Sequence, residues 1–548
     1  MSNCIKEPKW LDNAVFYEIY PQSFNDTNAD GIGDIPGIIE KLDYIKDLGC
    51  TALWLNPCFL SPFGDAGYDV EDYYTVAPRY GTNADLVRLF KESHARDMHV
   101  ILDLVPGHTA VTCKWFRESM KAEKNAYTDR YVWTDNIWET PENMGCIRGI
   151  SDRDGSCVVN FFSHQPALNY GFYRPDPDKK WQQPMDADGP MATREELKNI
   201  MRFWLGLGCD GFRVDMAGSL VKNDEDSKGT ISLWQDIRTF LDKEFPAAAM
   251  VSEWGEPDKS LVGGFHMDFL LHFGPSHYND LFRCEEPYFS SRGKGSAREF
   301  VAKYKENYEK TNGRGLICIP SGNHDMDRLA RSLSPEEMKR AFAFLLSMPG
   351  APFIYYGDEI GLRYVEGLTS VEGGYGRTGS RSPMQWDKTP NAGFSSAPDE
   401  KLYVRQDDAP DRPDAASQCA DEASLRSEVK RLIALRMAHP ALQSKGTISF
   451  LTDNYPLAYV RSSAEESILV IINPSATPAV LSAEDLCTVS NAPCSCNGSL
   501  LSADGSSVDG SLLAGDRILY TVGGTVKEGS NNSLQVDGGT AAFISLTK

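Results

Sequence analysis

Ionisable side chains stand at the end of several short apolar segments of this sequence. They comprise acids, one arginine and two histidines, and each follows a run that reads as a buried strand. Because the carboxyl ends of parallel strands meet on one face of a barrel, we expect these groups to converge there. One such group alone would more simply cap a helix or fill a core, but a converging set favours chemistry. The residues are Asp103, His108, Arg213, Asp215, Glu253, His324 and Asp325.

Two of these acids suit double displacement at a glycosidic bond. That reaction needs two carboxyl groups about 5 Å apart, one attacking the anomeric carbon and the other exchanging a proton with the leaving oxygen and water. Asp215 follows Arg213 by two residues, and we expect the guanidinium to keep it ionised. Glu253 precedes Trp254, and we expect the apolar ring and nearby negative charge to leave it protonated. The sequence therefore predicts a nucleophile and an acid/base in different surroundings.

Apolar segments and helical patterns alternate through the first four hundred or so residues, and this alternation positions the ionisable groups. Continuously apolar strands between helices indicate a parallel sheet covered on both faces. Eight such units close into a TIM (β/α)8 barrel. Seven segments are clear and GFHMDFLLHF is the eighth candidate; the seven are NAVFYEIYP, CTALWLNP, HVILDLVP, CDGFRVDM, AAMVSEWG, GLICIPSG and APFIYYGD.

The helical patterns have recognisable ends. Isoleucines and leucines recur at helical spacing from Ile35 to Leu48, and Gly49 follows as a stop. A capping box, Thr193 with Glu196, predicts the start of the helix in TREELKNIMRFWLGLG.

Two regions do not show this alternation of apolar segments and helical patterns. A long segment after the third strand is rich in aromatic and turn-forming residues, which predicts an inserted small domain. The last hundred residues carry short β runs between Gly, Ser, Asn and Asp turns, which predicts an all-β sandwich. The expected domains are a first barrel part at 1–104, the insertion (domain B) at 105–172, a second barrel part at 173–444 and the C-terminal sandwich at 445–548.

Four stretches around the ionisable residues, in the order DLVPGH, GFRVDM, SEWG and SGNHD, resemble the signature stretches of glycoside hydrolase family 13, the α-amylase family. QPALNY resembles the additional stretch at the end of that family's domain B. The resemblance covers almost the whole chain. It implies Asp215 as nucleophile, Glu253 as general acid/base and Asp325 as the group that grips the sugar's 2- and 3-hydroxyls. It also implies that the sugar and the nucleophile are held by Asp103, His108, Arg213 and His324.

One branch of the family is favoured by the stretch RSPMQWDKTPNAGFS, which is typical of oligo-1,6-glucosidases, α-glucosidases and trehalose synthases. In that branch the residue matching Tyr68 stacks on the sugar, and those matching Asp69 and Arg381 pair to hold the terminal glucose. A pair of this kind closes the cleft into a pocket, so the resemblance implies a retaining, exo-acting α-glucosidase of short maltose- or isomaltose-type sugars. Met216 stands where the branch uses Val for 1,6-linkages and Ala or Thr for 1,4-linkages, so linkage preference stays open.

Alternative functions share the same residues. A glucosyl transferase or isomerase of the trehalose synthase type would use the same covalent intermediate with another acceptor. A non-catalytic relative, such as the ectodomains of amino-acid transporter heavy chains, would typically have lost catalytic carboxylates and carry a membrane span. This chain keeps Asp215, Glu253 and Asp325 and has no apolar run long enough for a span, which disfavours that class.

The first expected loop of the barrel contains a calcium-like pattern, DTNADGIGD. Oxygen side chains alternate with other residues as in an EF-hand loop, but Gly37 stands where the bidentate Glu would be, and a strand precedes the loop. In the branch this chain resembles, the same loop often holds one structural calcium ion (Ca2+), and the alternative is an acidic turn that binds nothing. The resemblance implies side-chain ligands from Asp26, Asn28, Asp30 and Asp34 and the carbonyl of Ile32.

Bulk composition limits the partners. The 77 acidic and 55 basic residues give a net charge of −22, which disfavours binding to nucleic acid or anionic membranes. Thirteen scattered cysteines indicate free thiols rather than a disulfide framework. The first ten residues contain no apolar segment of the signal type, so we expect a soluble, cytoplasmic enzyme acting on a small α-glucoside.

Overall fold

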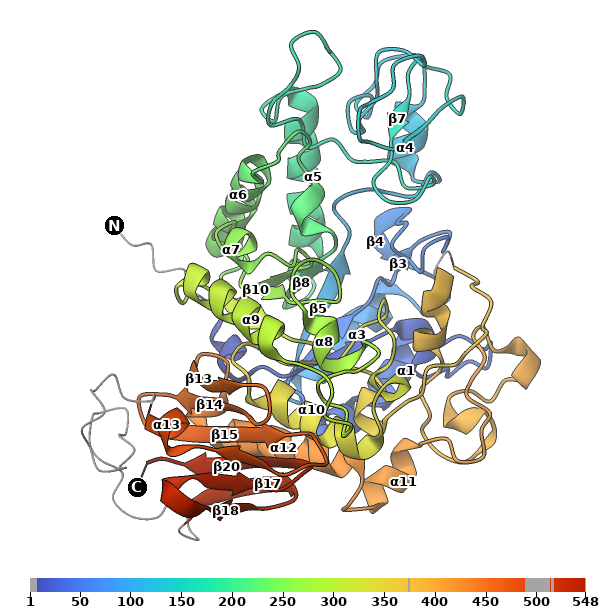
Figure 1. Cartoon of the computed structure of the whole chain (residues 1–548). Helices are drawn as coiled ribbons and strands as arrows, with labels where there is room; N and C mark the ends of the chain where they lie inside the picture. Colours follow the sequence, from blue (N-terminus) through green and yellow to red (C-terminus); the bar gives the residue numbers. More distant parts are fainter. Residues whose placement is uncertain (1–6, 373–374, 488–512, 514–516, 548) are drawn as a thin grey trace.

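A computed structural model describes residues 7–372, 375–487, 513 and 517–547. The first six residues, which bear on the expected absence of a signal segment, lie outside this part. A barrel of eight parallel strands forms the centre of the molecule, in the order β11-β10-β9-β8-β5-β2-β1-β12, and a parallel bridge from Pro320 to Phe353 joins the two edges (Figure 1). All eight predicted strands are present, so the predicted barrel is confirmed. They are β1 (Phe16–Ile19), β2 (Ala52–Leu55), β5 (His99–Leu104), β8 (Gly211–Val214), β9 (Ala249–Ser252), β10 (Met267–Phe269), β11 (Leu316–Cys318) and β12 (Phe353–Tyr355).

The barrel interior is filled by aromatic side chains. The rings of Phe16 and Phe353 stack at 4.2 Å, and Phe269 meets Phe353 edge-on at 4.7 Å. Trp54 lies against both Phe269 and Phe353, and all four rings are buried. This packing explains why the strands are apolar along their whole length, because each is covered by the barrel core and by the outer helices.

Helices surround the barrel, and two of them differ from the predictions. The expected helix from Ile35 to Leu48 is interrupted at Lys41, although Gly49 ends it as predicted with φ 105°. The predicted capping box at Thr193 is wrong: the helix begins at Asp188, and Thr193 donates within it to the Gly189 carbonyl. The helices are α1 (Ile35–Glu40), α2 (Leu42–Leu48), α3 (Asn83–His94), α4 (Lys114–Ser119), α5 (Asp188–Gly206), α6 (Lys228–Glu244), α7 (Pro257–Ser260), α8 (Tyr278–Phe282), α9 (Arg298–Thr311), α10 (Pro335–Ser347), α11 (Ala415–Ala420), α12 (Leu425–Ala438) and α13 (Ala483–Cys487).

The segment between β5 and α5 projects from the barrel at the top of Figure 1. It contains α4 and the small hairpin β6 (Cys146–Ile147) and β7 (Cys157–Val158), and a second hairpin, β3 (Phe59–Leu60) and β4 (Asp72–Val76), lies below it. Bridges from His108 to Ala167 and from Tyr131 to Leu168 bring the QPALNY stretch back to the end of the third barrel strand. The insertion therefore forms one wall above the strand ends.

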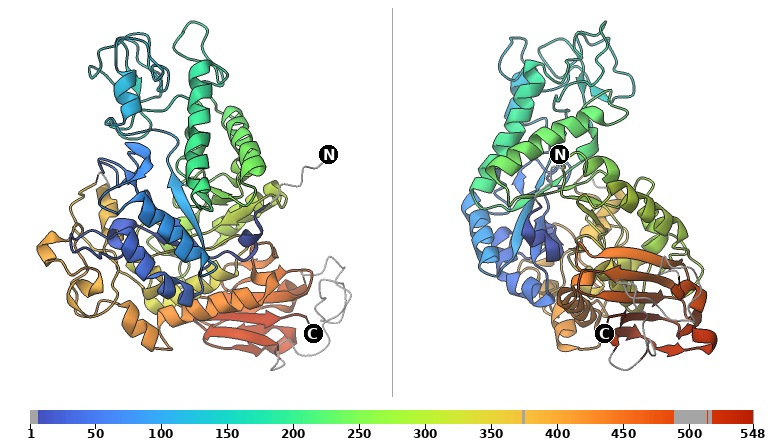
Figure 2. Two further views of the ribbon diagram at one scale, coloured as in Figure 1. Left: turned by 180° about the vertical axis from the view of Figure 1, so that it is seen from behind. Right: turned by 90° about the vertical axis from the view of Figure 1, so that its left-hand side faces the viewer.

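The C-terminal region is a β-sandwich, as predicted (Figure 2). Side chains alternate along β14: Ala458 and Val460 pack between the two sheets, while Leu457 and Tyr459 pack against the barrel. One sheet, in the order β13-β14-β15-β20-β17, consists of β13 (Thr447–Asp453), β14 (Leu457–Ser462), β15 (Ser467–Asn473), β20 (Thr540–Ser545) and β17 (Ile518–Gly523), and the other of β16 (Ala479–Leu481), β19 (Leu534–Val536) and β18 (Val526–Glu528).

Two further properties of the described residues bear on the sequence predictions. Every cysteine whose side chain is described is a free thiol. Among the helices in the described ranges, none combines the length and apolar character needed to cross a membrane.

The contact between barrel and sandwich depends on a buried arginine, Arg461 of β14. Its guanidinium donates to the carbonyls of Ser347, Gln443 and Gly446, so one side chain joins the end of α10 to the start of the sandwich. We expect Arg461→Ala to lower the free energy of unfolding by about 3 kcal/mol or more, because it leaves buried carbonyls without donors. Denaturant unfolding measures this difference.

The matched control is Arg298→Ala. Arg298 also faces the sandwich, through Asp453 at 3.4 Å, but its side chain is 66% exposed, so we expect a loss below about 1 kcal/mol. Equal losses in the two variants would contradict the assigned role of Arg461.

Candidate active site

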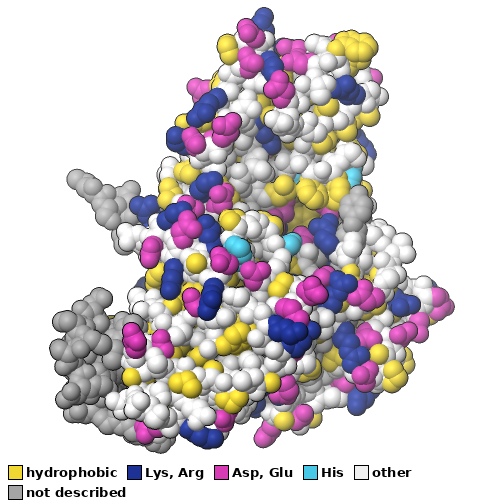
Figure 3. Space-filling model, in the orientation of Figure 1, with side chains coloured by type: hydrophobic (Ala, Val, Ile, Leu, Met, Phe, Trp, Pro, Cys, Tyr) yellow, Lys and Arg dark blue, Asp and Glu magenta, His cyan; other side chains and the backbone are white. Residues whose placement is uncertain are grey.

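The carboxyl ends of the barrel strands open into a cavity of about 530 Å³. The space-filling view shows the surface hollowed at this level, with acidic and apolar side chains at its rim (Figure 3). Most of the predicted catalytic and sugar-binding residues lie in or directly beneath this cavity. Its lining comprises Asp65, Tyr68, His108, Phe161, Asp215, Met216, Gly218, Ser219, Glu253, Trp254, Glu256, His272, Phe273, Asp325 and Arg377.

One guanidinium joins three of the predicted carboxylates. Arg213 and Asp215 are two residues apart along β8 and its end, so their side chains emerge on the same side of the strand. Arg213 is 1% exposed and lies 3.0 Å from Asp215, 2.9 Å from Asp103 and 2.8 Å from Glu253. The predicted nucleophile and the predicted acid/base therefore contact the same positive charge.

This sharing changes the protonation expected for Asp215. Burial and the neighbouring Glu253 carboxylate raise the pKa of Asp215 well above its usual value, and Arg213 opposes them only in part. The expectation that Arg213 favours the ionised form of Asp215 enough to outweigh burial is wrong, because that cation is divided among three acids. The surroundings of Asp215 therefore disfavour its charged form.

The backbone after the nucleophile is strained in a way that fixes this pair. Met216 has φ 44°, a left-handed conformation that is unfavourable for a residue other than glycine. In that conformation its N–H donates to the Glu253 carboxylate at 3.0 Å, and the Ala217 N–H donates to the Glu253 carbonyl at 3.1 Å. The turn therefore holds Glu253 beside Asp215.

Asp268, on the neighbouring strand β10, supports the segment that carries Glu253. Its Oδ1 accepts hydrogen bonds from the Ser252 hydroxyl at 2.7 Å and from the N–H groups of Trp254 and Gly255 at 3.3 Å. Burial raises the pKa of Asp268 to about 7. Sequence reasoning missed this residue, which lies in the strand segment GFHMDFLLHF.

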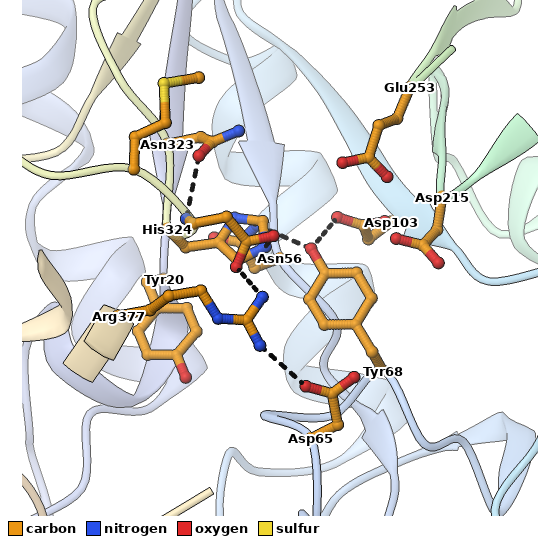
Figure 4. A network of polar contacts seen from close by, with 12 residues as sticks. Tyr20, Asn56, Asp65, Tyr68, Asp103, Asp215, Glu253, Asn323, His324 and Arg377 are labelled. Carbon is orange, nitrogen blue, oxygen red and sulfur yellow. Dashed lines mark hydrogen bonds and ion pairs between the residues drawn. The ribbon is translucent and has the colours of Figure 1, made fainter. Parts of the chain in front are cut away.

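Tyr68 and Asp103 meet at the base of the cavity, as Figure 4 shows. The Tyr68 hydroxyl and the Trp54 indole N–H both donate to Asp103 at 3.0 Å. Burial raises the pKa of Asp103 to about 6, against the opposing effect of Arg213. The Tyr68 ring stacks on His324 at 5.2 Å, so the predicted sugar platform is rigid.

His324 is fixed from beneath by residues that sequence reasoning did not single out. Its Nδ1 lies 2.9 Å from Glu18 and 3.1 Å from the Asn56 amide nitrogen, and all three side chains are buried. Burial lowers the pKa of His324 well below its usual value, so the ring is neutral.

His108 reaches the cavity from the end of β5. Its Nε2 lies 3.0 Å from the Tyr68 carbonyl and its Nδ1 3.1 Å from the Asn160 amide, and burial lowers its pKa to about 3. A side chain at Gly107 would meet that Asn160 amide at 2.5 Å. Asn160 of the insertion therefore occupies the space beside Gly107.

An arginine that was not predicted lines the cavity beside Asp325. Arg377 lies 2.7 Å from Asp325 and 3.5 Å from Asp65, and so bridges these two acids. Figure 4 shows its guanidinium turned toward Asp65. Arg381 contacts the same Asp325 oxygen at 2.8 Å. Burial alone would raise the pKa of Asp325, but the guanidinium groups of Arg381 and Arg377 lower it below its usual range.

The predicted pairing of Asp69 with Arg381 is wrong. Asp69 is fully buried and accepts hydrogen bonds from Ser61 and from the N–H groups of Gly64 and Asp65. It shapes the loop and does not face the cavity, while Asp65, four residues earlier, lines it. Both acids lie in one short loop, so sequence spacing could not distinguish them.

In the calcium-like loop, the Asp26 and Asp34 carboxylates accept hydrogen bonds from the loop's own backbone N–H groups or from the helix that follows it. Asp26 accepts three N–H groups of the loop at 2.9 to 3.0 Å, and Asp34 accepts the N–H of Gly37 at 2.7 Å and that of Thr27 at 3.0 Å. In the described part of the chain, Asp26, Asp30 and Asp34 do not place one carboxylate oxygen each within 4.8 Å of the other two. The donor types suit calcium, but their present arrangement does not surround a common point.

Comparisons with known proteins agree with this geometry. The family model of the alpha amylase catalytic domain matches residues 18–445. The trehalose synthase/amylase TreS of Mycobacterium tuberculosis strain CDC 1551 is 31% identical over 529 residues, covering 86% of this chain and 83% of the relative. The oligo-1,6-glucosidase of Parageobacillus thermoglucosidasius is 30% identical, covering 85% and 91%.

Solved structures share the fold of the whole chain. The trehalulose synthase MutB from Pseudomonas mesoacidophila MX-45 superposes with a TM-score of 0.77 at 24% identity, covering 98% of this chain and 99% of that one. A variant isomaltulose synthase from Erwinia rhapontici NX5, in complex with its natural substrate sucrose, gives the same TM-score and identity.

The pKa of Asp268 leads to a pH prediction. Between the ordinary aspartate value of about 3.9 and the native value, the folded state holds a proton that the unfolded state has released, so stability falls as pH rises. Asp268→Asn cannot titrate and keeps the accepting oxygen. We expect wild type to lose up to about 1.4 kcal/mol more than the variant for each pH unit between about 5 and 7, measured by urea unfolding.

Asp236→Asn, on the outer helix α6, serves as the control because its side chain is 40% exposed. This control should keep the wild-type pH dependence. An identical pH dependence in Asp268→Asn and wild type would show that Asp268 is ionised in the folded protein across this range.

Proposed function

This chain belongs to the α-amylase family of glycoside hydrolases, and within that family we propose that it is a retaining, exo-acting α-glucosidase. Its substrates would be short α-glucosides of the maltose or isomaltose type, bound with the non-reducing terminal glucose at the closed end of the cavity. Asp215, Glu253 and Asp325 would act on that glucose. Tyr68, Asp103, His108, Arg213, His324 and Arg381 would hold it or hold the groups that touch it.

The proposed reaction proceeds in two displacements. An Asp215 oxygen attacks the anomeric carbon while the glycosidic bond breaks and the Glu253 carboxyl gives its proton to the leaving oxygen. Glu253 then takes a proton from water, whose oxygen attacks the same carbon and releases Asp215. The shared contact with Arg213 supports these roles, because it holds the Asp215 and Glu253 carboxyl groups together at the lining of one cavity.

The observation that carries the proposal is the bridge formed by Arg377. This side chain links Asp65 to Asp325 at one end of the cavity, so a glucan chain could not continue beyond the sugar bound there. A glucose held there by its hydroxyls would leave only its reducing side open, which favours exo action over attack within a polymer. Placing Asp325 between two guanidinium groups also keeps it ionised for the sugar's hydroxyls.

A second candidate is transfer of the glucosyl group to another sugar. Relatives of comparable identity include a trehalose synthase/amylase, and the cavity mouth exposes Phe161 (57%) and Phe273 (40%). Exposed rings at the open end could stack on an acceptor sugar, which would then compete with water for the covalent intermediate.

Product analysis tests the proposal. The enzyme is incubated separately with maltose, isomaltose, trehalose and sucrose, and NMR identifies the products over time. We expect α-glucose to be the first glucose anomer released from at least one of maltose and isomaltose. Asp215→Asn should lower turnover by about 10³-fold or more, because it removes the nucleophile. The exposed control Asp236→Asn should retain full activity.

Several results would contradict the proposal. Accumulation of trehalose or longer sugars from maltose, with free glucose a minor product, would support the transferase instead. Release of β-glucose first would refute the retaining mechanism, and near-normal rates in Asp215→Asn would refute the assigned nucleophile.

We also propose a structural calcium site in the loop from Asp26 to Asp34. The oxygen-rich pattern supports it, and the ion would require the carboxylates to turn away from backbone N–H groups. The loop is already attached to the rest of the chain, through the Asp26 N–H to the Phe394 carbonyl and the Ser395 hydroxyl to Asp26. Calcium would therefore add stability to a formed loop rather than take part in catalysis.

Removal and return of calcium tests this site. The chelator EGTA should lower the melting temperature of wild type, and excess Ca2+ alone should restore it. Asp30→Ala removes an exposed ligand, so its melting temperature should not respond to either treatment. An unchanged melt of wild type together with no bound calcium by mass spectrometry of the metal content would refute the site.

A further inference from the structure

A cluster of two histidines and one aspartate lies on the barrel face opposite the active site. His94 is the last residue of α3, His99 is the first of β5, and Asp210 directly precedes β8. His94 Nε2 lies 2.7 Å from one Asp210 oxygen, and His99 Nδ1 lies 3.1 Å from the other. Their ligand atoms all lie within 4.8 Å of one another, the one cluster of this kind among the described residues.

The aspartate and one histidine of this cluster are held in place. The Val100 N–H donates to Asp210 Oδ2 at 2.8 Å, and the Asp210 N–H donates to the Val100 carbonyl at 2.8 Å, so strand pairing fixes the carboxylate. The Trp10 ring stacks on His99 at 4.3 Å, and its indole N–H donates to the Ala247 carbonyl. The donor atoms are therefore positioned by the barrel before any ligand arrives.

The cluster is also open to solvent. The side chain of His94 is 40% exposed and that of His99 is 32% exposed, whereas Asp210 is 18% exposed. An ion could approach from the histidine side and find the carboxylate behind. The chain carries a net charge of −22, which favours the approach of a cation.

We propose that His94, His99 and Asp210 form a binding site for a divalent transition-metal ion, best represented by Zn2+. Two imidazole nitrogens and a carboxylate oxygen are a donor set that Zn2+ accepts, with water as the fourth ligand. Binding replaces the contacts between the imidazoles and the carboxylate with bonds to one ion. The ion bonds to residues at the end of α3, at the start of β5 and directly before β8. It therefore links these three elements at the base of the barrel.

This site is independent of the proposed glucosidase activity. His99 begins the strand whose other end carries Asp103, so the length of the barrel separates the ion from the sugar cavity. Zn2+ at this site should raise the melting temperature and leave the rate of sugar cleavage unchanged. The two proposals can therefore fail separately.

Metal titration of the untagged, metal-free protein tests the proposal. Isothermal titration with Zn2+ should give a stoichiometry of one ion per chain, and binding should weaken at acid pH as the imidazoles take up protons. His94→Gln and His99→Gln should each weaken binding at least about tenfold. Co2+ should report tetrahedral nitrogen and oxygen ligands through its visible absorption.

His277→Gln is the matched control, because His277 is also exposed and also contacts an aspartate, Asp280 at 3.0 Å. Within the part of the chain that the structure describes, these two residues belong to no group of three possible ligands. This control should bind Zn2+ like wild type. Absence of stoichiometric binding, or affinity unchanged in the His94→Gln and His99→Gln variants, would overturn the site. Each variant's melting temperature without metal shows whether the substitution has disturbed the fold.

Discussion

The buried guanidinium of Arg213 is the interaction on which the active site depends. Taking a carboxylate out of water costs several kcal/mol, and three carboxylates surround this one cation. One positive charge cannot fully compensate three negative ones. The raised pKa values of Asp103 and Asp215 express that constraint. A group that can change its protonation at moderate pH is what acid/base catalysis needs.

The rest of the cavity keeps this charged centre in a fixed geometry. Tyr68 and Trp54 donate to Asp103, the strained turn at Met216 donates to Glu253, and Asp268 supports the same segment from the next strand. None of these contacts needs a substrate to form it. Electrostatic groups that are already oriented need little rearrangement during the reaction, which is how preorganised sites lower barriers.

A second charged group, around Asp325, has more cations than carboxylates. Here two arginines contact one aspartate, Asp325, and lower its pKa, whereas the pKa of Asp215 is raised. The difference follows from the ratio of cations to carboxylates in each place rather than from depth of burial. One cavity can therefore hold a proton-exchanging pair and a permanently charged hydrogen-bond acceptor for sugar hydroxyls.

Much of this protein could be predicted from sequence because the signals are local. Continuous apolar runs of strand length predict buried parallel strands, and a strand of known direction places its last residues on one face of the barrel. Asp103, Asp215 and Glu253 were found in this way, since their positions at strand ends depend on a few neighbouring residues. The start of α5 was missed because Ala187, at its observed beginning, carries no capping side chain, while Thr193 and Glu196 imitate a cap inside the helix.

Only the tertiary structure decided which side chains of each loop face the cavity. Asp65 and Asp69 are four residues apart in one loop, as are Arg377 and Arg381 in another, and each residue has the chemistry to bind sugar. Which of them faces the cavity depends on loop backbones folded against residues far away in the chain, such as Gln165 beside Asp65. The sequence by itself determined the barrel, the sandwich and the acids at the strand ends, because those follow from local periodicity. The partners of Arg213 and the bridge that Arg377 forms between Asp65 and Asp325 required the fold, because they join residues that are distant along the chain.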